Sequence, residues 1–270
     1  MLFSDLALAR RLEAMEAYCC VDTARGVARL HPEIATASEQ IAGGWAVFTG
    51  VGSPISEARA LGMDGPVTAA DMDRLESFYH SRGDAIRIEV CPLADVALHQ
   101  LLAARCYRLL EFSNMLSQPL AKGQRREPSS DDALITTRVA AASEGPLWAE
   151  TVARCFAGQM PITQELIDVI SCWTQSRIGA CYFAFVDGEI AGGGSVAVQD
   201  GVALLGGAGT VERFRGRGVQ QALIVARLEH GARAGCDLAM TVTLPGSGSQ
   251  RNCERAGFRV AYTRTKFVLD

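Results

Sequence analysis

The chain has 270 residues, of which 49% are apolar and 21% are charged, and its formal net charge is −4 at pH 7. This composition is typical of a globular protein with a sizeable core, and it excludes a disordered or low-complexity scaffold. The negative net charge argues against a protein that coats nucleic acid or an anionic membrane, because such partners select basic surfaces. At this length we expect two domains.

The sequence predicts a cytoplasmic protein without a membrane partner. Its first residues mix charges of both signs through Arg10, Arg11, Glu13 and Glu16, so they lack the apolar core of a signal peptide. No uncharged apolar run approaches the roughly 20 residues that span a bilayer. The nine cysteines include no CxxC pair, so we expect reduced, mostly buried thiols. The four histidines are scattered, and we expect no metal site.

In the first half of the chain, hydrophobic patterns predict a helix, a strand, a second helix and an extended segment. These elements fall at residues 75–80, 85–90, 93–105 and 107–116. The next residues combine two prolines with clustered charges and serines, which predicts a linker at 118–133.

The second half is expected to begin with a strand at 134–140 and two helices at 146–156 and 162–174. Three strands follow at 181–186, 190–198 and 202–211, joined by turns at Asp187-Gly188 and Asp200-Gly201. A helix at 219–234, a strand at 238–244, a helix at 250–256 and an extended segment at 258–269 complete the chain. Antiparallel strands followed by a helix and a strand parallel to the third indicate an α+β fold.

The end of the first half repeats the order at the end of the second half. Cys91-Pro92 and Leu244-Pro245 both end a strand and precede a helix. This order favours a duplicated domain, although a helix–strand–helix–strand arrangement also recurs by chance.

A glycine-rich turn connects the strand at 202–211 to the helix at 219–234. Gly216 and Gly218 leave backbone N–H groups open at the helix start, where the helix dipole favours an anion. Arg213, Arg215 and Arg217 crowd the same place, and a bound phosphate would neutralise them. The alternative is a solvated basic turn that only connects strand and helix.

The segment Arg215-Gly216-Arg217-Gly218-Val219-Gln220 fills five of the six places of the motif [Q/R]-x-x-G-x-[G/A]. Here the sequence resembles the GNAT superfamily of acyl-CoA-dependent N-acetyltransferases, and the resemblance covers 134–270, including an Ala256-Gly257-Phe258 ending. Gln220 departs from the family's preferred Gly or Ala. With the duplication, the resemblance implies an α+β protein of two tandem GNAT-like domains, each a mixed, mostly antiparallel twisted sheet flanked by helices. We expect them at 1–117 and 134–270.

The resemblance also implies acetyl-CoA as the acyl donor. In the family, backbone groups at the end of the strand before the loop hold pantetheine and the acyl carbonyl, and the loop N–H groups cradle the pyrophosphate. The positions implied here are Ala208, Gly209, Thr210, Arg215, Gly216, Arg217, Gly218, Val219, Gln220 and Gln221, with Ser249 and Asn252 as polar substitutes for a missing family residue.

Three further departures from the family's pattern leave the catalytic residues unassigned. Gly246 stands where many members have a pantetheine-binding asparagine, and Cys253 where many have a tyrosine that protonates the leaving sulfur. No carboxylate lies in the strand at 203–210, and Glu212 just beyond it is the nearest candidate base. The favoured alternatives are a core residue for Cys253 and a surface acid for Glu212.

The corresponding loop of the first half, at residues 60–73, has no basic residue and carries Asp64, Asp71 and Asp73. We therefore expect a degenerate, non-catalytic first domain. The predicted function is acetyl transfer from acetyl-CoA directly to an amine, with a small molecule as the favoured acceptor, in a monomer or homodimer that does not bind nucleic acid. The alternative is a catalytically inert acyl-CoA-binding or sensor module.

Overall fold

The computed structural model describes residues 3–120, 135–156 and 162–270. Its described residues fall into two units. Unit 1 contains the chain up to Leu116 together with Val242–Ser247 and Val260–Asp270, and unit 2 contains the described parts of Ser117–Thr241 together with Gly248–Arg259.

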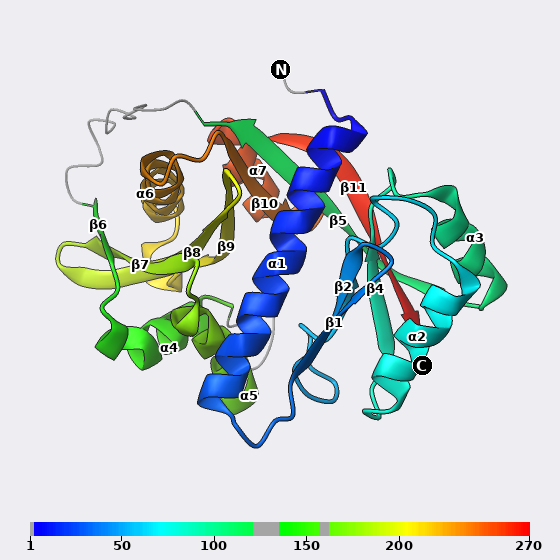
Figure 1. Cartoon of the computed structure of the whole chain (residues 1–270). Coiled ribbons are helices and arrows are strands. Elements are labelled where there is room, and N and C mark those ends of the chain that lie inside the picture. The colour runs from blue at the N-terminus through cyan, green and yellow to red at the C-terminus, as the bar shows by residue number, and fades with distance from the viewer. Residues whose placement is uncertain (1–2, 121–134, 157–161) are drawn as a thin grey trace. The chain divides into compact units, whose positions relative to one another are not determined.

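Unit 1 holds three helices and most of six strands (Figure 1). Its helices are α1 (Leu6–Leu30), α2 (Ala69–His80) and α3 (Val96–Ala104), and its strands are β1 (Ala37–Ile41), β2 (Gly44–Phe48), β3 (Ala58–Arg59), β4 (Ile86–Val90), β5 (Arg108–Pro119) and β11 (Arg259–Leu269).

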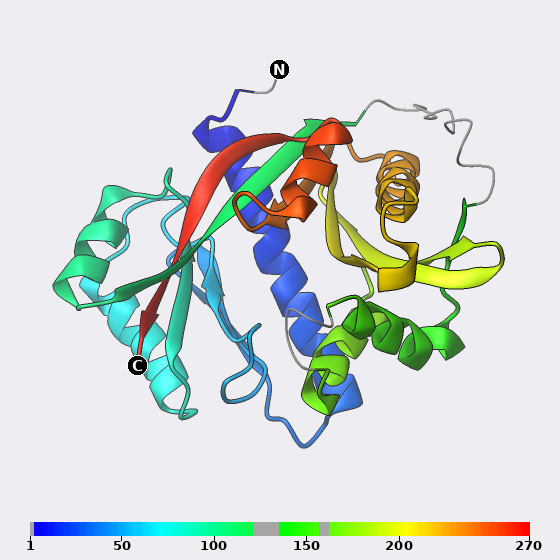
Figure 2. The same ribbon diagram turned by 180° about the vertical axis from the view of Figure 1, so that it is seen from behind.

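The sheet of unit 1 has the strand order β1-β2-β3-β4-β11-β5. Strands β1, β2 and β3 are antiparallel neighbours, and β3 runs parallel to β4. Strand β11 pairs antiparallel with β4, from Thr265 opposite Val90 to Leu269 opposite Ile86. Figure 2 shows β11 in red between β4 and the green β5. The last strand of the chain is therefore part of the sheet built by the first half.

Helix α1 was not predicted from the sequence. It begins at the N-cap Asp5, whose carboxylate accepts a hydrogen bond from the Leu8 backbone N–H at 2.8 Å. Leu12 and Met15 on its apolar face are buried, but so are the acidic Glu13 and Glu16. These acids interrupt the apolar pattern and are neutralised by residues distant in the sequence.

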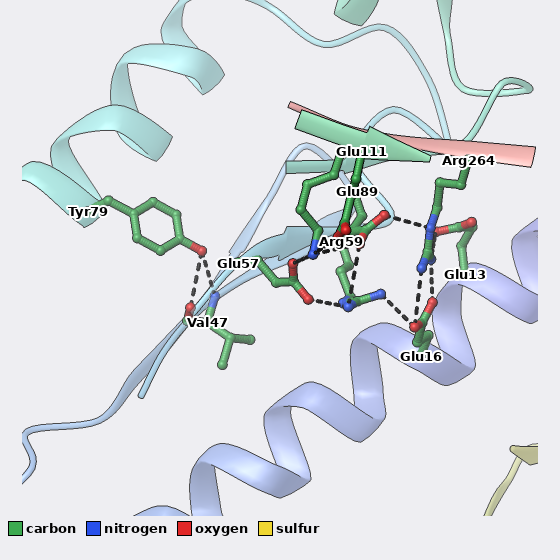
Figure 3. Close-up of polar contacts among 10 residues, drawn as sticks. Glu13, Glu16, Val47, Glu57, Arg59, Tyr79, Glu89, Glu111 and Arg264 are labelled. Atoms are coloured by element: carbon green, nitrogen blue, oxygen red, sulfur yellow. Dashed lines mark hydrogen bonds and ion pairs between the residues drawn. The ribbon is translucent and has the colours of Figure 1, made fainter. Parts of the chain in front are cut away.

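Five acidic and three basic residues form the ion cluster of unit 1 (Figure 3). Arg264 of β11 contacts Glu89 of β4 at 2.9 Å and also Glu16 of α1. Arg59 of β3 contacts Glu16 at 2.6 Å. The members are Glu13, Glu16, Glu57, Arg59, Glu89, Glu111, Arg264 and Lys266. The ion cluster thus connects β11 to α1, β3 and β4 through charges that are mostly buried.

Unit 2 has the strand order β10-β9-β8-β7-β6, in which only β9 and β10 among these described neighbours are parallel. This order confirms the predicted antiparallel strands followed by a parallel one. The strands are β6 (Ile135–Val139), β7 (Gly179–Val186), β8 (Glu189–Gln199), β9 (Val202–Thr210) and β10 (Leu238–Thr243); the helices are α4 (Gly145–Cys155), α5 (Gln164–Ser171), α6 (Val219–Arg233) and α7 (Gly248–Arg255), with short 3-10 turns η2 (Ala142–Glu144), η3 (Cys172–Gln175) and η4 (Glu212–Phe214).

Glycines in β8 let helices approach both faces of this sheet closely. A Cβ atom added to Gly193 would lie 2.9 Å from Trp148 of α4, whereas one added to Gly194 would lie 3.1 Å from Arg227 of α6. Because successive residues of a strand point to opposite faces, α4 and α6 cover opposite faces of the sheet.

The two units differ from the two continuous segments expected at 1–117 and 134–270. Residues 260–270, expected in the second segment, lie in unit 1. Gln118 and Pro119, expected in the linker, are strand residues of β5, and linker positions 121–133 lie outside the described residues. The local pattern predicted the strand at the end of the chain but not its neighbours, because strand pairing depends on tertiary contacts.

All nine cysteines are described, and none forms a disulfide bond. In the described part of the chain, no helix is long and apolar enough to cross a membrane.

Candidate functional site

The turn between β9 and α6 depends on glycine. Gly216 has φ +77° and Gly218, the N-cap of α6, has φ +89°, a left-handed conformation that other residues rarely adopt. Between strand and helix, the buried ring of Phe214 anchors the turn. The residue directly before the first helical turn, Gly218, therefore has no side chain that could cover the backbone N–H groups of that turn.

The start of α6 differs from the start of α2, its counterpart in unit 1. No side chain of the described residues caps α6, and its first turn carries no acid. Helix α2 has a complete capping box, in which Thr68 accepts from the Asp71 N–H at 3.1 Å and Asp71 accepts from the Thr68 N–H at 3.0 Å. The helix dipole and uncapped N–H groups of α6 fit a phosphate or pyrophosphate, whereas at the start of α2 the N–H groups of Thr68 and Asp71 already donate to side chains.

The three arginines of the turn are not equivalent. Arg213 contacts Glu189 at 2.6 Å and Arg217 contacts Asp187 at 3.1 Å, both exposed ion pairs with the β7–β8 hairpin. Arg213 and Arg217 therefore already have acidic partners, and their neutralisation by a bound anion stays a prediction. The half-exposed Arg215 makes longer contacts, 3.4 Å to the Cys155 carbonyl and 3.9 Å to Glu212. Exposed pairs are weak, so a phosphate can compete for these side chains.

Strand β9 contains a bulge near its end, before the turn that leads to α6. The register with β8 jumps from Gly193 opposite Gly209 to Ser195 opposite Gly206, so Gly207 and Ala208 lie outside the regular pairing. Gly207 has φ +44°. Across the other edge, β9 pairs with β10 only from Val202 to Leu204 within the described register, although β9 continues to Thr210. The half-buried backbone from Gly206 to Thr210 is thus available to an extended ligand.

Two side chains enclose the bulge on the α4 face. A Cβ atom on Gly207 would lie 2.0 Å from the ring of Trp173 in η3, and one on Gly209 would lie 2.2 Å from Cβ of Cys155. Trp148 is fully buried and donates to the Tyr182 carbonyl at 2.9 Å, whereas Trp173 is only half-buried and lies at the bulge.

The predicted polar residues of α7 lie on one helix. Ser249 makes a side-chain hydrogen bond with Cys253, as their spacing of one helical turn predicts. Cys253 is buried, and burial raises the pKa of its thiol, so it stays protonated. Asn252 is half-buried. A protonated buried thiol suits both explanations of Cys253, as a core residue and as a proton donor.

The other predicted positions have distinct environments. Val219 buries its side chain in the core, so only its backbone N–H group can face a ligand, while Gln220 and Gln221 are half-buried. Glu212 is exposed at 89% of its side chain in η4. Gly246, which stands where the family often has asparagine, has φ +72° in an exposed turn.

Sequence reasoning missed Arg227. This residue of α6 is 2% exposed, and burial lowers its pKa to about 10, so it is still charged at neutral pH. It follows Leu223 by four residues and so lies on the apolar face of α6. A charged residue on an apolar helix face is the signal that sequence reasoning could have used.

Residues 148–258, which contain β8, β9, α6 and α7, match the family model described as acetyltransferase (GNAT) family. These residues are therefore similar to a GNAT domain. No curated protein sequence matches the chain.

Two solved GNAT structures resemble the chain over almost its whole length, and a third resembles it over 69%. A GCN5-related N-acetyltransferase from Kribbella flavida is 16% identical with a TM-score of 0.66, and the match covers 93% of this chain and 94% of that one. A tandem GNAT protein from the clavulanic acid biosynthesis pathway is 18% identical with a TM-score of 0.58, covering 99% and 96%. A GCN5-related N-acetyltransferase from Sphaerobacter thermophilus is 19% identical with a TM-score of 0.50, covering 69% and 59%. The chain therefore has the predicted fold of two tandem GNAT-like domains.

GNAT domains use acyl-CoA as donor, and the residues of unit 2 fit such a group. The uncapped glycine start of α6 fits the pyrophosphate, and the bulged, half-buried end of β9 fits the narrow pantetheine arm. The matching turn of unit 1 is closed by its capping box.

Proposed function

We propose that the chain is an N-acetyltransferase that moves an acetyl group from acetyl-CoA directly to the amine of a small molecule, at a site in unit 2. The observation that carries this proposal is the succession of a bulged β9 and an uncapped α6 joined by Gly216 and Gly218. One element offers donors for an acyl chain and the next offers donors for a pyrophosphate.

In this proposal the backbone N–H groups from Gly216 to Gln221 and the side chain of Arg215 hold the pyrophosphate. The backbone of Ala208, Gly209 and Thr210 holds the pantetheine arm and orients the acyl carbonyl. Ser249 and Asn252 of α7 supply further polar contacts to the arm.

A bound acetyl-CoA would supply a thioester whose carbonyl carbon bonds to the amine nitrogen as its carbon–sulfur bond breaks, giving an amide and coenzyme A. The protein contributes by positioning the two reactants and by donating backbone hydrogen bonds to the acyl oxygen, on which negative charge develops. Glu212 is accessible to water and is the candidate to accept the amine's proton, and the protonated Cys253 is the candidate to donate one to sulfur.

Unit 1 is proposed to be a non-catalytic copy. The N–H groups at the start of α2 are taken by Thr68 and Asp71, and the acidic Asp71 would repel a pyrophosphate. Arg59 of β3 also lies 3.9 Å from Glu89 of β4, which bridges the strands that correspond to β9 and β10. The free thiols of the chain fit a reducing compartment, and we propose the cytoplasm.

The first experiment is calorimetric titration of acetyl-CoA into the wild type and into Gly218→Asp. The new side chain strains a left-handed position and adds negative charge to the start of α6, so binding should be lost. Gly235→Asp is the matched control, because Gly235 has φ +84° near the other end of α6 with open space around it. A wild type that binds no acetyl-CoA, or a Gly218→Asp variant that binds as the control does, contradicts the proposal.

A second candidate function is an inert acyl-CoA-binding module, favoured by the missing tyrosine at Cys253 and by the strand without a carboxylate at 203–210. Both candidates predict binding in the titration. Release of coenzyme A in the presence of a panel of primary amines separates them, because an inert module releases none.

A further inference from the structure

Arg227 is a buried cation without an acidic partner. Within residues 3–120, 135–156 and 162–270, no carboxylate lies within ion-pair distance of its guanidinium. Leaving a charge buried and unpaired is costly, so its neighbours must compensate through other dipoles.

The compensating groups are backbone carbonyls at the β9 bulge. Nη1 of Arg227 donates to the Gly206 carbonyl at 3.0 Å and to the Ser195 carbonyl at 3.2 Å, while Nε donates to Leu223 of its own helix at 2.9 Å. Ser195 and Gly206 are the paired residues that border the bulge. The guanidinium therefore joins the two strands at the point where their regular hydrogen bonding stops.

Gly194 makes room for this arrangement. A Cβ atom there would lie 3.1 Å from Cζ of Arg227, closer than ordinary contacts. The missing side chain of Gly194 in β8 thus leaves the space beside the bulge that the Arg227 guanidinium occupies.

We propose that Arg227 is a positioning residue of the acyl-transfer site, which holds the β9 bulge in shape and makes the Gly207 N–H a stronger donor toward the acyl carbonyl that the neighbouring backbone of β9 orients. This inference rests on the proposed function. The Gly206 carbonyl and the Gly207 N–H belong to one peptide group, so a cation on the oxygen makes the N–H a stronger donor. The helix that binds the pyrophosphate at its start thereby also supports the acyl end of the site two turns later.

The test compares Arg227→Met, which removes the charge and the donors, with Arg227→Lys, which keeps the charge. Arg233→Met is the matched control on the same helix, because the Arg233 side chain is 66% exposed. Infrared difference spectra of acetyl-CoA labelled with carbon-13 at its carbonyl report how strongly the protein polarises that bond. Calorimetry gives the affinity for acetyl-CoA, and coenzyme A release gives kcat.

We expect the carbonyl band of bound donor to lie below that of free donor in the wild type and in Arg233→Met. In Arg227→Met it should return toward the free value and kcat should fall by about tenfold to a hundredfold, while the affinity set by the start of α6 changes little. Arg227→Lys should give a carbonyl band and a kcat between those of the wild type and Arg227→Met. A residue that only supported the fold would change the melting temperature but not the band of folded, donor-loaded protein.

These measurements distinguish a failure of the proposed function from a failure of the role of Arg227 alone. A wild type without acetyl-CoA binding overturns the proposed function and this inference together. A wild type that binds, with an unchanged band and kcat in folded Arg227→Met, overturns the role of Arg227 alone. Should Arg227→Met not fold, Arg227→Gln decides, because it removes the charge but keeps an N–H donor, and a wild-type band and kcat in that variant also contradict the proposal.

Discussion

Gly207 shows how a single residue shapes the site. Its φ of +44° places it at the bulge of β9, and its Cα faces the ring of Trp173. No side chain can be added here without moving the ring of Trp173. The half-buried Trp173 can therefore pack against the bulge only because residue 207 is a glycine.

We expect Gly207→Ala to destabilise unit 2 by about 1–3 kcal/mol, the usual cost of an overpacked core position, and to weaken acetyl-CoA binding. The neighbouring Gly206→Ala is the control, because its Cβ atom would meet only Ser195 Oγ, at 3.3 Å, among the described atoms. Urea unfolding and calorimetry provide the two measurements. If both variants lost the same amount of stability and of affinity for acetyl-CoA, Trp173 would not set the shape of the bulge.

The cysteines make a second prediction at the residue scale. Burial raises the pKa of Cys155 to about 11 and that of Cys181 to about 12. Because the thiolate is the reactive form, a thiol reagent at mildly alkaline pH should label the exposed Cys106 rapidly and these two only on unfolding. Mass spectrometry of the labelled peptides checks the order. Rapid labelling of Cys155 in folded protein would contradict its burial beside Gly209.

At the scale of elements, the connection of α1 to β11 depends on the ion cluster of unit 1. Although burial opposes its ionisation, Arg264 and Arg59 lower the pKa of Glu16 from 4.5 to about 2. A carboxylate with a lowered folded-state pKa contributes stability that is complete above its unfolded pKa and is lost as the pH falls toward the folded value. Burial raises the pKa of Glu13, which acts in the opposite direction.

We therefore expect Glu16→Gln to destabilise unit 1 by about 3–5 kcal/mol at neutral pH, because it removes the carboxylate that the buried Arg59 and Arg264 share. The loss of stability between pH 4.5 and 2 should become shallower in this variant. Hydrogen exchange of β2 and β4 in urea measures both effects. The exposed Glu39, paired with Arg74 at 2.7 Å, provides the control Glu39→Gln, which should cost less than about 1 kcal/mol.

The sequence patterns predicted the elements of the second half well, from the strand at 181–186 to the helix at 250–256. They also identified the turn from Arg215 to Gln221, because glycines and a helix start carry a local signal. They missed α1, whose buried face includes Glu13 and Glu16, and they missed the β9 bulge and Arg227. Those features depend on contacts between residues far apart in the chain, which periodicity does not contain.

At the scale of the whole molecule, the placement of β11 determines which residues belong to each unit. The resemblance assigned residues 134–270 to one domain, yet β11 pairs with β4 and supplies Arg264 and Lys266 to the ion cluster of unit 1. Sheet partners and buried charges, not sequence position, decide where this strand belongs.

Deletion of residues 260–270 should therefore disrupt unit 1, although that unit is built mainly from the first 116 residues. Hydrogen exchange should show lost protection in β2 and β4 and retained protection in β7, β8 and β9. Removing Asp270 alone, an exposed partner of Arg108, should leave both patterns unchanged. Equal loss of protection in the two units would show that β11 is not specific to unit 1.

The place of β11 also sets an order for folding during synthesis. The ribosome makes residues 260–270 after every residue of unit 2, so unit 2 has all its strands before unit 1 receives its sixth. Domains usually fold from the N-terminus onward as they emerge. Here the first unit must wait with an open sheet edge at β4, and nascent chains should acquire a native second unit before a native first one.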